Sequence, residues 1–230
     1  MIKSGIDHDA IVKMFSEAST KQGEALRKAV SEATLKALQG REMSMENIKK
    51  VVKNMTEAVT AGAAQNVSSP VDVEALLGKA FAGMDAALLQ GVEASHKALQ
   101  QFVSQGAALQ DKQMKGAIAN IEKMEDMFFA TVTKAAQGVS GPMQGPWDQV
   151  LGAMKLKGTG TGAQATQTVE QLVAQAQTAL RDGRAAGAKT AQAMMDSYAA
   201  LVSGVLIGMS EGLQGGKAPD AAAASKAKKK

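Results

Sequence analysis

Apolar residues recur at spacings of three and four along almost the whole 230-residue chain, and no stretch alternates apolar and polar residues with a period of two. This spacing places apolar side chains on one face of an α-helix. Alanine, glutamine, lysine and glutamate, which favour helix, are abundant between these positions. The pattern predicts an all-α protein whose long amphipathic helices form an elongated bundle or a coiled-coil-like assembly.

Residues 1–66 are predicted to form a pair of helices. The first runs from Asp7 to about Gln39, and Gly40 suits the left-handed position that commonly ends a helix. Ser44 is a good capping residue for the second helix, from Met45 to about Gln65.

Residues 67–137 are predicted to form one long amphipathic helix. It begins at Ser69-Pro70, because serine caps a helix and proline suits the first helical position. No proline or loop cluster follows until Gln137, so a helix of about 68 residues, roughly 100 Å long, is possible. Its apolar stripe must be covered by another helix or by an apolar surface. The stripe includes Phe81, Leu88, Leu99, Phe102, Met124 and Phe128.

Residues 138–162 are rich in glycine and proline and read as a linker around a short helix, Trp147–Lys155. Residues 163–214 are predicted to form a C-terminal helix rich in alanine and glycine, which ends near Gly212. Small residues fill half of its apolar face, so this helix is predicted to be an interface. The larger residues of that face include Met194, Tyr198, Leu201 and Val205.

Three glycines of this last helix, Gly204, Gly208 and Gly212, lie four residues apart. Each interior glycine costs about 1 kcal/mol relative to alanine, and close approach of another helix offsets that cost. Small residues at this spacing form a smooth flank for such an approach. We therefore expect close helix packing along this flank.

The formal net charge of +4 belongs to the end of the chain. Residues 217–230 hold five lysines and one aspartate, so the remainder has 21 basic and 21 acidic residues. We expect residues 215–230 to be disordered, because their composition cannot bury enough apolar surface. Lysines at this density attract polyanions. The predicted polyanion-binding residues are the four lysines nearest the end, Lys226, Lys228, Lys229 and Lys230.

Candidate chemistry is sparse, which predicts a protein that is not an enzyme and has no cofactor, metal or small-molecule substrate. Cysteine is absent, and there are two histidines. Glu93 and His96 have the spacing of a di-iron ligand pair but lack the second Glu-x-x-His that such a site needs. The glycine-rich run 158–162 precedes a helix but has neither nucleotide-binding pattern. Neither histidine has a sequence cue that marks it as the general base of a serine nucleophile.

No targeting segment is evident near Met1, and the longest apolar stretch, Tyr198–Met209, is shorter than the ~20 residues of a membrane span. We therefore expect a cytoplasmic protein. The chain has fourteen methionines, whose pliable side chains fill loose cores or cover irregular apolar surfaces.

The last third of the chain resembles the phasins, the helical proteins that coat bacterial polyhydroxyalkanoate granules. The resemblance lies in Ala191–Tyr198, in the Gln-Ala repeat at 174–177 and in the lysine-alanine tail at 224–230. It implies a non-enzymatic protein that lays amphipathic helices on a polymer granule or lipid-like body and associates with itself.

Two other functions compete with that one. The first is a cytoplasmic homo-oligomeric scaffold whose lysine-rich tail binds nucleic acid or anionic lipid, since lysines neutralise phosphates. The second is a metal-binding bundle built around Glu93 and His96. The leading expectation is a granule-associated coat protein whose partners are itself and a hydrophobic polymer or lipid surface.

Overall fold

The computed structural model of the chain describes residues 7–39, 44–66, 70–104, 112–138, 143–181 and 198–215. Throughout these ranges the regular structure is helical and there are no strands, which confirms the predicted all-α class. The elements are α1 (His8–Glu17), the 3₁₀ turn η1 (Thr20–Gln22), α2 (Gly23–Gln39), α3 (Met45–Gln65), α4 (Pro70–Ser104), α5 (Lys112–Glu122), α6 (Met124–Gln137), α7 (Gln144–Lys157), α8 (Gly160–Arg181) and α10 (Tyr198–Gly215).

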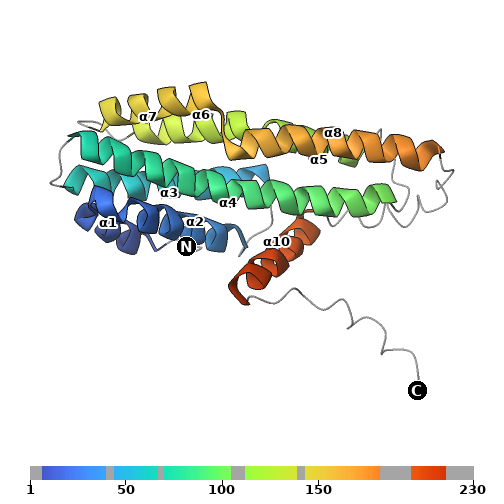
Figure 1. The fold of residues 1–230 in the computed structure, drawn as a ribbon, viewed down its shortest axis with the longest axis horizontal. Coiled ribbons are helices and arrows are strands. Elements are labelled where there is room, and N and C mark those ends of the chain that lie inside the picture. Colours follow the sequence, from blue (N-terminus) through green and yellow to red (C-terminus); the bar gives the residue numbers. More distant parts are fainter. Residues whose placement is uncertain are drawn as a thin grey trace, which may run out of the picture.

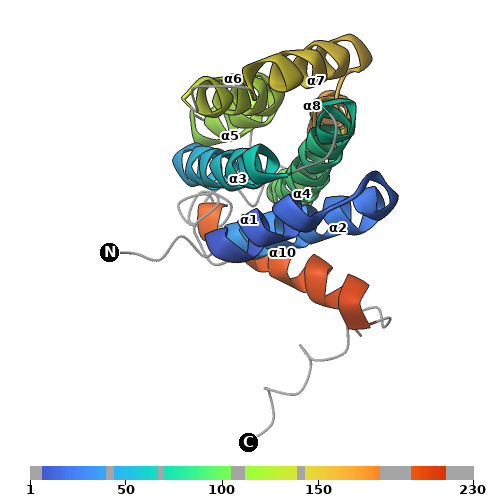
Figure 2. The ribbon, with the colours of Figure 1, turned by 90° about the vertical axis from the view of Figure 1, so that its left-hand side faces the viewer.

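The helices form an elongated bundle organised around α4 (Figures 1 and 2). Helix α4 contacts α2, α3, α7, α8 and α10. Helices α1 and α2 lie on one side of α3 and α4, and α6 and α7 lie on the other side (Figure 1). Helix α10 packs against α4 and α2 at the edge of the bundle.

Two predicted helix starts are confirmed. The Ser44 side chain accepts a hydrogen bond from the backbone N–H of Asn47 at 3.3 Å, which satisfies one free donor at the start of α3. Helix α4 begins at Pro70, as the sequence indicates. The capping role expected of Ser69 and the helix-ending role expected of Gly40 lie outside the described residues.

The single helix predicted from Asp7 to Gln39 is wrong, because α1 ends at Glu17 and Ala18 has extended backbone with ψ 141°. The Asn66 side chain donates to the carbonyl oxygens of Phe15 and Ala18, at 2.7 and 2.9 Å, and so satisfies acceptors at the end of α1. Ser19 and Gln22 then form a capping box that starts the next turn. These contacts stabilise a corner that lets α1 pack against α3.

The single long helix predicted for residues 67–137 is also wrong. Phe81 of α4 and Phe128 of α6 are in ring contact, which one continuous helix through both residues could not allow. Lys123, with ψ 0°, separates α5 from α6, and residues 105–111, between α4 and α5, lie outside the described part. The interruption has a physical benefit, because α5 and α6 can fold back against α8 and α3. The apolar stripes of the two halves are thereby buried within one chain, which a continuous rod could not achieve.

The short helix predicted within the linker region 138–162 is present as α7, which is longer than predicted at both ends and packs against the bundle. Trp147 of α7 is 1% exposed, and its indole N–H donates to the Thr60 hydroxyl of α3 at 3.0 Å. Of the C-terminal helix predicted at 163–214, α8 and α10 account for the two ends, and α8 begins three residues earlier than predicted, at Gly160. The intervening residues 182–197 lie outside the described part.

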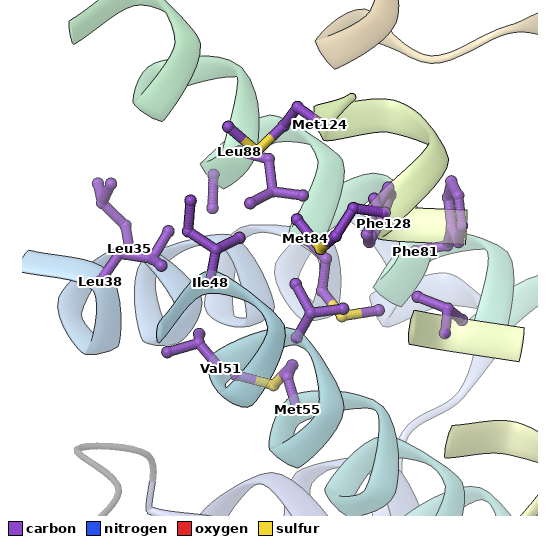
Figure 3. Close-up of a cluster of buried hydrophobic side chains, with 14 of the residues drawn as sticks. Leu35, Leu38, Ile48, Val51, Met55, Phe81, Met84, Leu88, Met124 and Phe128 are labelled. Carbon is purple, nitrogen blue, oxygen red and sulfur yellow. The ribbon is translucent and has the colours of Figure 1, made fainter. Parts of the chain in front are cut away.

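The core joins α2, α3, α4 and α6 (Figure 3). Phe81 and Phe128 are in ring contact with centroids 4.6 Å apart, Met84 lies beside Phe128, and Met55 is fully buried in the same cluster. Methionines of α3 and α4 are thus core residues, where their flexible side chains fill space between aliphatic and aromatic groups. The other labelled members of the cluster are Leu35, Leu38, Ile48, Val51, Leu88 and Met124.

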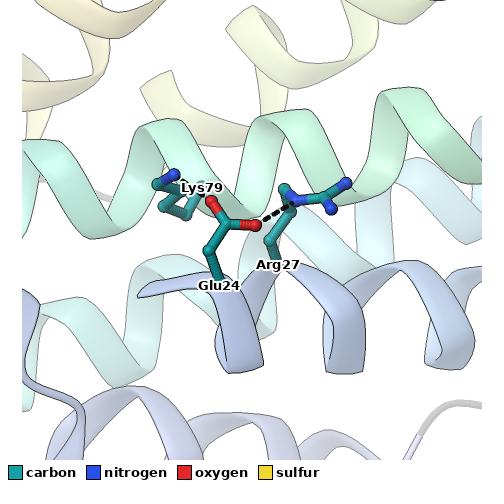
Figure 4. A network of polar contacts seen from close by, with 3 residues as sticks. All are labelled: Glu24, Arg27 and Lys79. Carbon is teal, nitrogen blue, oxygen red and sulfur yellow. Dashed lines mark hydrogen bonds and ion pairs between the residues drawn. The ribbon is translucent and has the colours of Figure 1, made fainter. Parts of the chain in front are cut away.

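A surface ion-pair network links α2 to α4 (Figure 4). The Glu24 carboxylate accepts from Lys79 of α4 and from the Arg27 Nε–H, the latter at 2.8 Å. These hydrogen bonds, first that of Lys79 and then that of Arg27, lower the pKa of Glu24 from 4.5 to about 2. The carboxylate is 65% exposed, so solvent and salt screen the pairing.

The lowered pKa of Glu24 predicts a small acid-dependent contribution to stability. Folding favours the ionised carboxylate, so the contribution is present above pH 4.5 and disappears as the pH falls toward about 2. We expect the Glu24→Gln variant to unfold at a lower urea concentration than the wild type near neutral pH, and the two midpoints to converge near pH 2. A constant difference across that range would contradict this assignment.

Candidate hydrophobic-surface and self-association face

Six residues of the predicted surface face are core residues of a single chain. None of the six side chains is more than 4% exposed. Helices α2, α8 and α10 cover α4, and α6 packs against α3, so the stripe is satisfied internally. This corrects the prediction that these residues form a surface open to a partner. They are Phe81, Leu88, Leu99, Phe102, Met124 and Phe128.

The remaining described residues of the predicted face lie on α10. Val202 and Leu206 are buried against the bundle, whereas Leu201 and Val205 are partly buried and pack against its edge. Ile207, on another side of the same helix, is 37% exposed. Helix α10 contains one charged residue, Glu211. An apolar helix that is half covered therefore occupies the edge of the bundle (Figure 2). Met194, the remaining residue of the predicted face, lies outside the described residues.

Tyr198 anchors the start of α10. Its ring lies 6.3 Å from that of Phe102 in α4, measured between centroids. Burial raises the pKa of the Tyr198 hydroxyl to about 12, and a hydrogen bond with the Ser95 side chain acts in the opposite direction. Ser95 of α4 is 6% exposed and donates to the Gly91 carbonyl at 2.9 Å. This end of α10 is thus held by both aromatic and polar contacts.

Among the described residues, none packs closely against Gly204, where the sequence predicts close helix packing. A Cβ atom at Gly204 would meet nothing within 4 Å, and the residue is exposed. The surroundings of Gly208 and Gly212 are not described. The predicted polyanion-binding lysines all lie outside the described part of the chain. Close approach instead occurs at Gly62, against Val12 and Phe15 of α1, and at Gly83, against α2.

The glycine-rich run before α8 is a helix start capped by the chain's own carboxylates. Asp85 of α4 accepts from the backbone N–H groups of Gly160 and Thr161, at 2.9 and 3.0 Å. Glu125 of α6 accepts from the N–H and the hydroxyl of Thr159, at 3.1 and 2.6 Å. These acids occupy the position in which a phosphate would bind a helix N-terminus. The run therefore connects α8 to α4 and α6.

The sequence alone does not reveal these two capping acids. Asp85 and Thr161 are 76 residues apart, and each sits in an ordinary helical context. Gly-Thr-Gly-Thr-Gly is the one available signal, and it indicates a helix start without naming the acceptor.

Removing the Asp85 cap should destabilise the bundle. We expect Asp85→Ala to lower the free energy of unfolding by about 1–2 kcal/mol, because two donors at the start of α8 lose a charged acceptor. Asp148→Ala, at an exposed position of α7, is the matched control and should change stability by less than about 0.5 kcal/mol. Urea unfolding followed by circular dichroism measures both; equal losses would show that Asp85 is not a significant cap.

His96 lies partly buried on α4, and its Nε2 atom is buried without a hydrogen-bond partner among the described residues. Desolvation lowers the pKa of this imidazole, Glu93 raises it and Lys97 lowers it. Among the described residues no group of three or more histidine, aspartate or glutamate side chains is arranged to hold a metal ion.

Residues 1–215 match DUF6781, a family of unknown function. The chain belongs to this family. No curated protein and no solved structure matches the chain. The DUF6781 match covers every described helix, so the bundle, the capped start of α8 and the edge helix α10 all lie within the family region. No helix in the described ranges has the length and apolar character needed to span a membrane.

Proposed function

We propose that this protein coats a hydrophobic surface, a polyhydroxyalkanoate granule or a lipid-like body, and that it attaches through α10. The observation that carries the proposal is that α10 is apolar and that the bundle covers it only in part. It has one charged residue in eighteen, and its apolar side chains are shared between the bundle and the exterior. A helix with uncovered apolar side chains can bury them in the boundary of an apolar phase, at a depth of about 5–10 Å.

The sealed core determines how such attachment works. The apolar residues of α3, α4 and α6 are buried against one another, so exposing them to a surface would sacrifice their mutual packing. Helix α10 has fewer contacts to lose, since it packs mainly against the second half of α4 and against α2. We therefore assign adsorption to α10 and assign the bundle the role of a folded, hydrophilic cover.

Co-flotation tests this proposal. Purified protein mixed with polyhydroxyalkanoate granules or with triacylglycerol droplets should rise with them through a density gradient. A chain that ends at Arg181, after α8, provides the matched comparison and should stay at the bottom. If the full chain fails to float above a soluble control protein, the proposal is wrong.

A second candidate, a homo-oligomeric scaffold, is favoured by the open flank of α10. Leu201, Val205 and Gly208 follow one another at helical spacing, and Gly204 beside them meets nothing within 4 Å. A second copy of α10 would find room for its backbone there. Co-flotation and sedimentation equilibrium together separate the two candidates, because a scaffold forms a defined oligomer but does not rise with the droplets, whereas a coat protein rises with them.

A further inference from the structure

A groove of about 660 Å³ runs between α3 and α6 and combines an apolar floor with a cationic rim. Met127 and Ala135 are buried and supply the floor, and Ala130 extends it toward the exterior. Four lysines line the groove: Lys49, Lys50 and Lys53 from α3 and Lys134 from α6. The volume lies within the range of about 300–1,000 Å³ that is typical of small-molecule sites.

The charges around the groove do not balance. Lys50 pairs with Glu46 at 2.6 Å, and Lys53 pairs with Glu57 at 3.7 Å. Lys49 and Lys134 have no carboxylate within 4 Å in the part of the chain that the structure describes. Two cationic heads are therefore left at the border of an apolar hollow, and their aliphatic stems add to its apolar lining.

We propose that this groove binds a single-chain anionic amphiphile such as a fatty carboxylate. The carboxylate head lies against Lys49 and Lys134, and the hydrocarbon chain lies along Met127, Ala130 and Ala135. The two parts of the ligand match the two parts of the groove. The anionic head offsets the excess positive charge of the rim, and the alkyl chain leaves water when it packs on the apolar floor.

The composition of the groove distinguishes this ligand from other anions. Among the described residues, its lining has no aromatic side chain on which a nucleic-acid base could stack. The hollow on the other side of Lys134 contains Glu125 and Asp126 and has no comparable cationic excess. The site goes beyond the proposed coat function, since α6 and α10 lie on opposite sides of the bundle (Figures 1 and 2).

Titration calorimetry with dodecanoate below its micelle concentration tests the proposal. The wild type should bind dodecanoate at least tenfold more tightly than octanoate, since each buried methylene contributes up to about fourfold. Dodecyltrimethylammonium, which has the same chain and a cationic head, should not bind measurably. Dodecanoate should also protect Lys49 and Lys134 from acetylation.

Two sets of variants locate the site. The double variant Lys49→Ala/Lys134→Ala should weaken dodecanoate binding at least tenfold, whereas Lys13→Ala/Lys115→Ala, at exposed positions of α1 and α5, should leave it unchanged. Ala130→Phe fills the groove from an exposed position and retains all four lysines, so it should also weaken binding at least tenfold. Unchanged circular dichroism shows that each variant folds.

Several results would overturn the proposal: absence of dodecanoate binding, equal weakening in both lysine double variants, or full binding by Ala130→Phe. Binding of anionic phospholipid vesicles without binding of monomeric dodecanoate would also overturn it and would indicate surface attraction by the lysines. Binding abolished by Val205→Asp would place the ligand on α10. Failure of the coat function alone leaves these outcomes unaffected.

Discussion

Val205→Asp and Leu201→Asp are each expected to weaken adsorption to polyhydroxyalkanoate granules or lipid droplets at least tenfold. Both side chains are partly buried at the edge of α10, on the flank that is shared between the bundle and the exterior. A carboxylate at either position must be desolvated when the helix enters an apolar boundary, and a cost of about 1.4 kcal/mol already corresponds to tenfold. The fraction of protein that floats with the droplets measures the loss.

Lys115→Asp serves as the control for these variants, because Lys115 is an exposed residue of α5. It changes the net charge by more than the two test substitutions do, so a general charge effect would appear in it first. We expect its adsorption to remain within about twofold of the wild type. Light scattering of the same proteins reports self-association, which the α10 substitutions should also reduce. Equal behaviour of all three variants would show that α10 is not the adhesive face.

Gly83→Ala should be among the most destabilising single-methyl substitutions in the chain. A Cβ atom at Gly83 would lie 2.5 Å from the backbone oxygen of Arg27 and 3.0 Å from Val30 Cβ. Helices α2 and α4 would have to separate, which disturbs their shared apolar contacts. We expect a loss of about 2–3 kcal/mol in the free energy of unfolding, the range seen when well-packed cores are overfilled.

Gly78→Ala provides a control within the same helix. A Cβ atom at Gly78 meets nothing within 4 Å, so the substitution gains helix propensity without a clash. We expect it to stabilise the protein by up to about 1 kcal/mol. Urea unfolding monitored by circular dichroism compares the two variants. If both substitutions shift stability in the same direction, α2 and α4 do not approach as closely as described.

The sequence reveals the helical class and several local starts, because these depend on neighbouring residues. Ser44 and Pro70 identify the beginnings of α3 and α4 through capping chemistry and fixed backbone geometry. The break after Glu17 is harder to predict, since part of what stabilises it is Asn66, 48 residues beyond Ala18. Local pattern alone therefore merges α1 and α2 into one helix.

The candidate face shows the same limit more clearly. An apolar stripe has the same periodicity whether it is covered by helices of its own chain, by a second copy or by a lipid or polymer surface. Phe81 and Val205 therefore look alike in the sequence. The fold separates them, because α6 brings Phe128 to within 4.6 Å of Phe81 while Val205 remains at the edge of the bundle. Similarly, Gly83 and Gly204 are both interior helix glycines, and the position of α2 determines which of them is tightly packed.

Hydrogen–deuterium exchange on droplet-bound protein tests the central claim, that α10 adsorbs while the bundle stays folded. Comparison with the free protein should show slower exchange of the amides in α10 and unchanged exchange in α3 and α4. Faster exchange in α3 and α4 on the droplet would mean that the bundle opens to expose its core, and unchanged exchange in α10 would mean that another surface adsorbs. Either result would contradict the account.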